Sequence, residues 1–371
     1  MRFPEFSGEW EKTSIGECFS KVENGLTYDT DNTSGVPVTR IETISDKSIN
    51  YDRVGYANID DKISKYEMQY GDVLFSHINS LKHIGKTAFY DAAQPLYHGM
   101  NLLLLRAKKS LDSKFLYYTL NTHKFLHRCQ VLANQAVNQA SINTKELKSI
   151  NISVPQMQEQ QKISGLISLL DERIDTQKKI IEKYESLIRG LYQFLFQQAK
   201  YDHFVSLGDI SQISNGNSDV KDASMYNDGS LYPFFDRSDE IKFLPEYLFD
   251  KEAIIYPGEG AEFYPRYYNG KFALHQRCYA IYDISTDFIP RYLYHYCKTQ
   301  NSYFVRNAVG STVASLRLDT FKRLKIPAIP THHQESLVMF LDKIEAKIEC
   351  NRTILKKYEE QKKYLLSNLF I

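Results

Sequence analysis

The sequence predicts a mixed α/β (α+β) protein made of two similar globular units, each followed by a long helix. Two observations predict this fold class. Between Pro155 and Phe196, apolar residues recur at alternating steps of three and four, which is the heptad pattern of a coiled coil. The same pattern returns between Leu337 and Leu369. Because a globular stretch precedes each helix, the chain is typical of a duplicated unit with pseudo-twofold symmetry.

The two long helices are near-copies of each other. Lys183-Tyr184-Glu185 recurs as Lys357-Tyr358-Glu359, and Leu195-Phe196 recurs as Leu369-Phe370. The globular stretches match far less well. This contrast is expected when the duplicated helices keep the same structural role while the surfaces of the globular units come to recognise different targets.

Each amphipathic helix must bury its apolar stripe, and the simplest partner is the other long helix. A two-fold relation between the units makes that pairing antiparallel. It then brings Gln177 and Asn351, the polar slots near the middle of each heptad pattern, close together. A polar layer fixes register at some cost in stability, so we predict this role for both residues; the alternative is a layer that faces solvent. Lys362 stands where the first helix has Ile188, and faces either a partner or water.

The first globular unit, residues 1–155, is predicted to contain strands and helices. Short apolar runs after turn residues indicate strands, and aromatic–apolar spacing or a capping pattern indicates helices. The predicted strands are Val36–Ile41, Val73–Phe75, Leu102–Arg106 and Ile150–Val154, and the predicted helices are Lys114–Leu126 and Ser141–Leu147.

The second globular unit, residues 200–330, has parallel parts, and the long helices take the ranges 156–199 and 331–371. Asn24-Gly25 recurs as Asn215-Gly216, and the stretch that begins at Ser141 recurs from Ser315. The predicted strands are Ala253–Tyr256, Tyr279–Tyr282 and Leu324–Pro327, and the predicted helix is Tyr292–Cys297.

Composition is ordinary for a globular protein of about two domains, with 371 residues, 43% hydrophobic and 25% charged. The net charge of +1 counts against a dedicated nucleic-acid binder, although a basic face can exist within a neutral total. No apolar run reaches the roughly 18 residues that a membrane span needs. The N-terminal residues lack the apolar core of a signal peptide. The five cysteines form no closely spaced pair, so a reduced cytoplasm is expected.

The doubled architecture resembles the specificity subunit of Type I restriction-modification enzymes. Local signatures are similar as well: Ile152-Ser153-Val154-Pro155 precedes Glu159-Gln160, and Ile326-Pro327-Ala328-Ile329-Pro330 precedes Gln334-Glu335. The second copy reverses the Glu-Gln order that the family shows at the start of the helix.

This resemblance implies that each globular unit is a target recognition domain that reads one half of a split sequence in double-stranded DNA. It implies that the helices form an antiparallel coiled coil that separates the two domains. It also implies docking of two methyltransferase (modification) subunits, joined by restriction/translocase subunits. S-adenosylmethionine, ATP and magnesium would belong to those partners, and this chain would bind no cofactor.

Catalytic chemistry is not indicated in the chain itself. The sequence lacks an Asn-Pro-Pro-Tyr-like tetrapeptide and a glycine-rich cofactor loop after a strand. Gly85-Lys86-Thr87 is like the end of a P-loop, but Ser80 stands where the motif needs glycine, which favours a basic turn. We therefore predict no catalytic residue and no metal ligand.

Polar loop clusters are the candidates for DNA contact, because Arg, Lys, Asn and Gln read base edges while hydroxyl and basic groups hold phosphates. Taken singly, each residue is more readily explained as a solvated loop side chain than as a base contact, and only the resemblance favours DNA contact by the clusters. In the first unit they are Ser76, His77, Asn79, Ser80, Lys82, Gln135, Asn138 and Gln139, and in the second Arg237, Ser238, Arg266, His275, Arg277, Ser311, Thr312 and Arg317.

Two other functions stay open at this point. The first alternative to a Type I specificity subunit is the recognition subunit of a related two-component enzyme, whose partner both cuts and methylates. The second is a coiled-coil scaffold that binds only proteins. The neutral charge suits the scaffold.

Overall fold

The computed structural model describes residues 2–29, 31–45, 48–59, 63–136, 139–198 and 201–370. The chain divides into two compact bodies. The first body comprises Met1–Gln177 and Ile354–Ile371, and the second comprises Lys178–Thr353. The four-part division into domains that the sequence predicts, with boundaries at residues 155, 199 and 330, stays a prediction. None of the described helices is both long and apolar enough to span a membrane.

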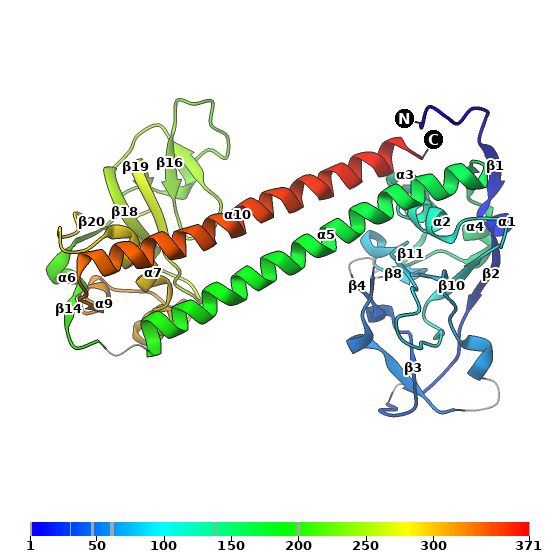
Figure 1. Cartoon of the computed structure of the whole chain (residues 1–371), viewed down its shortest axis with the longest axis horizontal. Helices are drawn as coiled ribbons and strands as arrows, with labels where there is room; N and C mark the ends of the chain where they lie inside the picture. Colours follow the sequence, from blue (N-terminus) through cyan, green and yellow to red (C-terminus); the bar gives the residue numbers. More distant parts are fainter. Residues whose placement is uncertain are drawn as a thin grey trace. The chain divides into compact units, whose positions relative to one another are not determined.

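Both long helices form, and each contributes to both bodies (Figure 1). The first, α5, spans Met157–Tyr192 and continues as a π-helical segment, Gln193–Gln198. The second, α10, spans Thr331–Asn368. In both, the heptad positions are the most buried part of the helix surface, as the pattern predicts.

Within the first body the start of α5 runs antiparallel to the end of α10. Ile163 and Ile167 share one apolar cluster with Leu365 and Leu369. Arg173 Nη1 donates to Tyr358 Oη at 3.3 Å. This body therefore contains one half of an antiparallel helix pair.

Lys362 occupies an apolar slot of the heptad pattern, and the structure gives it a partner. Its ammonium group pairs with the Asp171 carboxylate and lies 5.9 Å from the centre of the Tyr118 ring. Lys362 therefore faces a partner in this body, one of the two outcomes expected from the sequence.

Within the second body the end of α5 runs antiparallel to the start of α10. Ile188 packs in one apolar cluster with Leu341, Ile344 and Ile348. Arg352 Nη2 donates to Glu185 Oε1 at 2.6 Å. The same heptad positions are thus used in both bodies.

The sheet of the first body has the strand order β2-β10-β7-β9, and every pairing in it is antiparallel. A separate pair joins β1 to β13, and the short helix α4 precedes β13. The bounds are β1 Glu11–Ser14, β2 Phe19–Asn24, β7 Val73–Phe75, β9 Thr87–Phe89, β10 Leu103–Ala107, α4 Thr144–Ser149 and β13 Asn151–Val154.

The sheet of the second body repeats this order as β15-β20-β18-β19 and adds β16 and β17 beyond β19. The pair β14-β21 repeats the pair β1-β13. The bounds are β14 Phe204–Ser206, β15 Gln212–Asn215, β16 Tyr232–Phe235, β17 Lys242–Leu244, β18 Phe249–Pro257, β19 Arg266–Leu274, β20 Cys278–Tyr282 and β21 Lys325–Pro327. The duplication therefore extends through the globular parts, where the sequences diverge.

The repeated Asn-Gly pair has a steric reason in each body. A Cβ atom on Gly25 would collide with the carbonyl oxygen of His98, and one on Gly216 with that of Leu274. Only glycine allows the backbone to pass this closely. The pair therefore marks the same crossing in both copies.

Three predicted elements differ from the structure. The helix expected over Ser141–Leu147 is α4, because Ser141 belongs to a strand (β12, Gln139–Ser141) and Asn143 caps the helix. The single helix expected over Lys114–Leu126 is two helices, α2 (Ser113–Leu120) and α3 (His123–Leu132). Asn121 caps the C-terminus of the first helix, and Thr122 caps the N-terminus of the second, because its Oγ1 accepts from the backbone N–H of Phe125. The strand expected over Val36–Ile41 is β3 (Val36–Val38), and a 3₁₀ turn begins at Ile41.

The core of the second body lies between its sheet and the long helices. Helix α7 (Pro290–Lys298) contacts β18 and β19, and α8 (Asn301–Asn307) and α9 (Leu318–Lys322) follow it. Tyr256, Tyr292 and Phe321 are fully buried there. Many of the tyrosines are thus core residues with satisfied hydroxyl groups, such as that of Tyr256 on the Cys297 carbonyl at 3.1 Å.

Candidate nucleic-acid interface

In the first body, the two polar clusters predicted from the sequence meet in one small antiparallel sheet. Its order is β11-β12-β8, with β8 at Ile78–Asn79, β11 at Asn134–Ala136 and β12 at Gln139–Ser141. Asn79 pairs with Ala140, and Ser141 lies between Ile78 and Asn134. Segments more than fifty residues apart in sequence therefore pair in one small sheet.

Ser76 and His77 are buried and hold this loop in place. Ser76 Oγ accepts a hydrogen bond from Asn79 Nδ2 at 3.1 Å. His77 Nε2 lies 3.4 Å from Asn24 Nδ2, and its Nδ1 has no partner among the described residues. Burial lowers the pKa of His77, so the ring is neutral at pH 7. These two side chains support the loop.

The exposed side chains of the loop are Ser80, Leu81 and Lys82, of which Ser80 and Lys82 are polar. Ser80 Oγ lies 3.0 Å from Nδ1 of His83, the residue at the end of the same polar loop. Gln135 and Gln139 lie on β11 and β12, and Asn138 lies outside the described residues. The exposed loop thus offers hydroxyl and ammonium groups.

In the second body, four of the predicted residues line one groove of about 540 Å³: Arg237, Ser238, His275 and Arg277. Lys242, Asp219, Asp236 and Glu259 complete its charged lining. Three carboxylates therefore face the three cations Arg237, Lys242 and Arg277 in this groove.

Asp236 organises one wall of the groove. Lys242 Nζ lies 2.5 Å from Asp236 Oδ2, and Ser238 Oγ donates to Asp236 Oδ1 at 2.6 Å. Burial disfavours the ionised carboxylate, but these hydrogen bonds outweigh it and keep the pKa of Asp236 below its ordinary value. Arg266 donates to the carbonyl oxygens of Asp236 and Ser238 and lies 5.9 Å from the Phe235 ring centre. Arg266 therefore fixes the backbone of the segment that carries Asp236 and Ser238.

Arg277 and Glu259, which both line the groove, form an ion pair through one nitrogen of the guanidinium. Arg277 Nη1 lies 2.7 and 2.9 Å from the two carboxylate oxygens of Glu259. The Arg277 side chain is 63% exposed, so it can reach an external ligand. The backbone N–H of Arg277 donates to His275 Nδ1 at 3.2 Å, which fixes the turn that carries both residues.

The loop that holds Ser311 and Thr312 repeats the arrangement of the first body. The backbone of Ser315 forms antiparallel β-bridges with Glu259 on one side and with Val309 on the other. Ser141 is paired in the same way, with Ile78 of β8 and Asn134 of β11. Ser311 and Thr312 are exposed, and exposed Arg317 precedes α9. The candidate surfaces of the two bodies therefore occupy equivalent places in the repeat.

Sequence patterns missed several residues of these surfaces. Asn24 has a signal, because Asn24-Gly25 recurs in the second copy and Asn24 Nδ2 donates to the Met100 carbonyl at 2.8 Å. Asp236 and Glu259 have no such signal, since acidic side chains do not indicate a DNA surface by themselves, and no motif in the sequence distinguishes Lys242. Their roles follow only from the packing of β16, β17 and β18.

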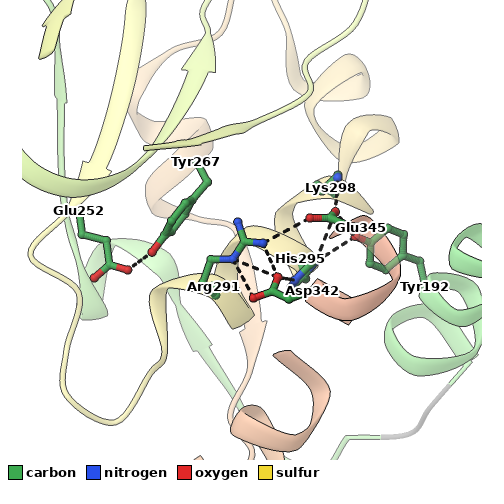
Figure 2. A network of polar contacts seen from close by, with 8 residues as sticks. All are labelled: Tyr192, Glu252, Tyr267, Arg291, His295, Lys298, Asp342 and Glu345. Carbon is green, nitrogen blue, oxygen red and sulfur yellow. Dashed lines mark hydrogen bonds and ion pairs between the residues drawn. The ribbon is translucent and has the colours of Figure 1, made fainter. Parts of the chain in front are cut away.

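A second polar cluster joins α7 to both long helices in the second body (Figure 2). Fully buried His295 contacts Asp342 Oδ1 through Nε2 at 2.8 Å and Tyr192 Oη through Nδ1 at 2.9 Å. Lys298 Nζ lies 2.5 Å from Glu345 Oε1. Burial lowers the pKa of His295, and a neutral ring with its proton on Nε2 fits both contacts.

His295, Asp342 and Glu345 bring ligand atoms within 4.8 Å of one another, a spacing that could hold a metal ion. However, Arg291 also donates to Asp342, and Lys298 to Glu345. These two cations balance the two carboxylates, so the cluster is complete as an ion-pair network. It anchors α7 to the helices.

Comparison with known proteins gives one family. The chain matches the family described as "Type I restriction modification DNA specificity domain" twice, over residues 7–186 and 201–360. A putative type I restriction enzyme specificity subunit of Methanocaldococcus jannaschii is 39% identical over 204 residues, which are 54% of this chain and 48% of that protein. The match thus spans about half the length of that relative.

Two solved structures share the fold over nearly the whole chain. One is the crystal structure of the S subunit of a type I restriction-modification system from M. genitalium, with a TM-score of 0.71, 16% identity, and coverage of 100% of this chain and 99% of the other. The other comes from work on complex assembly and conformational transition of the type I system, with a TM-score of 0.55, 13% identity, and coverage of 98% and 97%. At these identities the likeness concerns the fold.

Proposed function

Because this chain belongs to the family of the type I restriction modification DNA specificity domain, we propose that it is the DNA-recognition subunit of a type I restriction-modification complex. Each copy of the domain reads one half of a bipartite target in double-stranded DNA. The observation that carries this proposal is the pair of candidate surfaces at equivalent places in the repeat.

The two half-sites differ in sequence. Support comes from the side chains, since the first surface offers Ser80 and Lys82 while the second offers Arg237 and Arg277. Arginine binds guanine O6 and N7 through two of its N–H groups, and the Arg277 side chain, which is 63% exposed, is available for such a contact. A protein with two unlike surfaces reads an asymmetric sequence rather than a palindrome.

The chain is non-catalytic and works with partner subunits. Two methyltransferase subunits dock on it, and restriction/translocase subunits join them. Those partners bind S-adenosylmethionine, ATP and magnesium. The complex acts in the cytoplasm, which agrees with the five free cysteines.

Methylome sequencing of cells with and without this gene tests the proposal. We expect one methylated motif to disappear with the gene, composed of two unlike half-sites separated by a fixed gap. A gel shift of the assembled complex adds a second test, because phosphate contacts make affinity fall steeply with salt. A palindromic motif, or binding that is insensitive to salt, would contradict the proposal.

Paired variants assign the half-sites to the two surfaces. Arg277→Ala removes a groove cation and is expected to relax one half-site by a factor of about 10, which corresponds to the roughly 1–3 kcal/mol of a good base contact. Lys82→Ala weakens binding to all sequences, as the loss of a phosphate contact does. Arg323→Ala is the matched control, since Arg323 is 80% exposed and lies outside the groove. Binding to a library of randomised half-sites measures all three.

A further inference from the structure

A cleft of about 300 Å³ lies in the first body at the end of α10, away from β8, β11 and β12. Its apolar lining includes Phe125, Ile152 and Phe370. Three cations, Lys12, Lys124 and Arg128, surround this apolar floor. A cleft of this composition suits a ligand with an apolar body and negative charge around it.

The three cations are unpaired within the described part of the chain. All three side chains are exposed, and none forms an ion pair with a described residue. Lys124 also lies in the first turn of α3, which holds no acidic residue. The helix dipole disfavours a cation there, so this placement costs stability. Such a local conflict is typical of a binding site.

The second body shows what fits this space, because α2 and α7 are equivalent helices. Phe115 of α2 stacks on Phe370 with ring centres 5.3 Å apart. Tyr292 of α7 packs on Phe196, the counterpart of Phe370, at 6.0 Å. One turn further along, α2 carries Thr119 where α7 carries a tyrosine.

That tyrosine, Tyr296, fills the equivalent space with its ring. Its ring lies 5.7 Å from that of Phe196, and its hydroxyl donates to the Lys325 carbonyl of β21 at 2.8 Å. In the first body, Thr119 and Asn151, the counterpart of Lys325 on β13, both line the cleft. The cleft therefore lies where the second body holds the ring of Tyr296, and equivalent residues line it.

We propose that this cleft binds an aromatic side chain presented by an acidic segment of a partner protein. The ring enters between Thr119 and Asn151 and packs on Phe370, as Tyr296 packs on Phe196. Carboxylates on either side of the ring pair with Lys12, Lys124 and Arg128. The proposal adds a protein-docking site to the recognition subunit and does not depend on which DNA sequence the chain reads.

The test measures fluorescence anisotropy of a labelled peptide, Glu-Asp-Tyr-Asp-Glu, titrated with the full chain. The same peptide with Ala in place of Tyr is expected to bind at least 10-fold more weakly. Thr119→Tyr fills the cleft from within and is expected to reduce affinity for the Tyr peptide by a similar factor. Lys124→Glu combined with Arg128→Glu is expected to abolish binding, whereas Lys109→Glu, an exposed charge reversal outside the cleft, leaves it unchanged.

Fluorescence of Trp10, whose ring lies 5.9 Å from that of Phe115, shows whether each variant keeps the first body folded. No binding of the Tyr peptide, equal binding of the Ala peptide, or full binding by folded Thr119→Tyr would overturn the proposal. Displacement of the peptide by a random-sequence DNA duplex would also overturn it, in favour of a nucleic-acid site. Loss of the methylated motif in cells is a separate readout that tests only the proposed function.

Discussion

At the scale of single residues, Gln160 and Gln334 explain the reversed order of glutamate and glutamine at the start of the second long helix. Gln160 accepts from the backbone N–H of Asp112 at 2.9 Å and donates to the Pro155 carbonyl at 2.8 Å. Gln334 accepts from the backbone N–H of Ile289 at 2.8 Å and donates to the Ile329 carbonyl at 2.9 Å. The glutamines are equivalent, and only the neighbouring glutamate changes sides. Glu159 has a separate task, an ion pair with Arg2.

Replacing Gln334 should destabilise the second body strongly. Its side chain is fully buried, and Gln334→Leu leaves the Ile289 N–H and the carbonyls of Ile329 and Asp287 without their partner. Buried unsatisfied groups cost roughly 1–3 kcal/mol in the free energy of unfolding. Gln161→Leu, at an exposed position of α5, is the control and should change little. Urea denaturation of both variants measures the difference; equal stabilities would contradict the clamp.

His295 makes stability depend on pH. Its folded pKa lies below the ordinary value of 6.5 because it is buried, despite the nearby carboxylates of Glu345 and Asp342. The stability that the neutral ring contributes is present above about pH 6.5 and is lost as pH falls through the lower, folded pKa. Tyr192 and the cations Arg291 and Lys298 complete the set of groups that face this network.

His295→Gln should therefore flatten the pH dependence of unfolding below pH 6.5. Glutamine can still donate to Asp342 but binds no proton, so the slope should fall by up to about 1.4 kcal/mol per pH unit, the value for one proton. His77 and His98 also have pKa values lowered by burial, and they contribute equally to both proteins. Urea midpoints from pH 7 to pH 5 provide the comparison; parallel curves would show that His295 does not titrate in this range.

At the scale of elements, the helix pairs were predictable because a heptad stripe has to be buried. Lys362 was the exception, and the structure explains it through Asp171, which also accepts a hydrogen bond from Tyr118 Oη at 2.8 Å. A cation fits the apolar stripe because its carboxylate partner comes from the other helix of the pair. Gln177 and Asn351 belong to different bodies, so their joint role in register stays a prediction.

A double-mutant cycle on Lys362 and Asp171 measures this contact. Lys362→Met and Asp171→Asn should each destabilise the first body, and the double variant should lose less than the sum. Because both side chains are partly exposed, at 18% and 30%, we expect a coupling of about 0.5–1 kcal/mol. The coupling should shrink in high salt. Strict additivity would mean that the pair adds nothing to the helix pairing.

The short elements show where local sequence reasoning fails. Lys114 to Leu126 has the spacing of one helix, yet Asn121 and Thr122 interrupt it. Asn121 is buried and donates to Thr87 Oγ1 at 2.7 Å, so a contact with a distant strand decides the break. Propensity along the chain carries no information about such a contact.

At the scale of the whole molecule, the long helices are expected to set the gap between half-sites. Each helix belongs partly to each body. Inserting one heptad into both should lengthen the spacer by about 10 Å, or roughly 3 base pairs. Methylome sequencing of the variant reports the new gap. An insertion in α5 alone is the control, because it breaks the register of the pair and should abolish function; an unchanged gap in the double insertion would contradict the ruler.

The fold class, the duplication and the family were predictable from the sequence, and all three were confirmed. They depend on patterns that repeat along the chain. The groove of the second body was predictable only as scattered polar residues, because β16 and β17 join the sheet through a parallel pairing of Phe234 and Phe235 with β19. The residues that touch bases stay a prediction.

The frame shared by the two bodies has an evolutionary consequence. The segments around Asn24-Gly25 and Gln160 have counterparts around Asn215-Gly216 and Gln334, and each pair makes the same interior contacts. Recombination between related genes with crossovers in these segments would exchange one whole globular unit without disturbing the interior contacts. Under the proposed function, such an exchange would change one half-site of the target in a single genetic event.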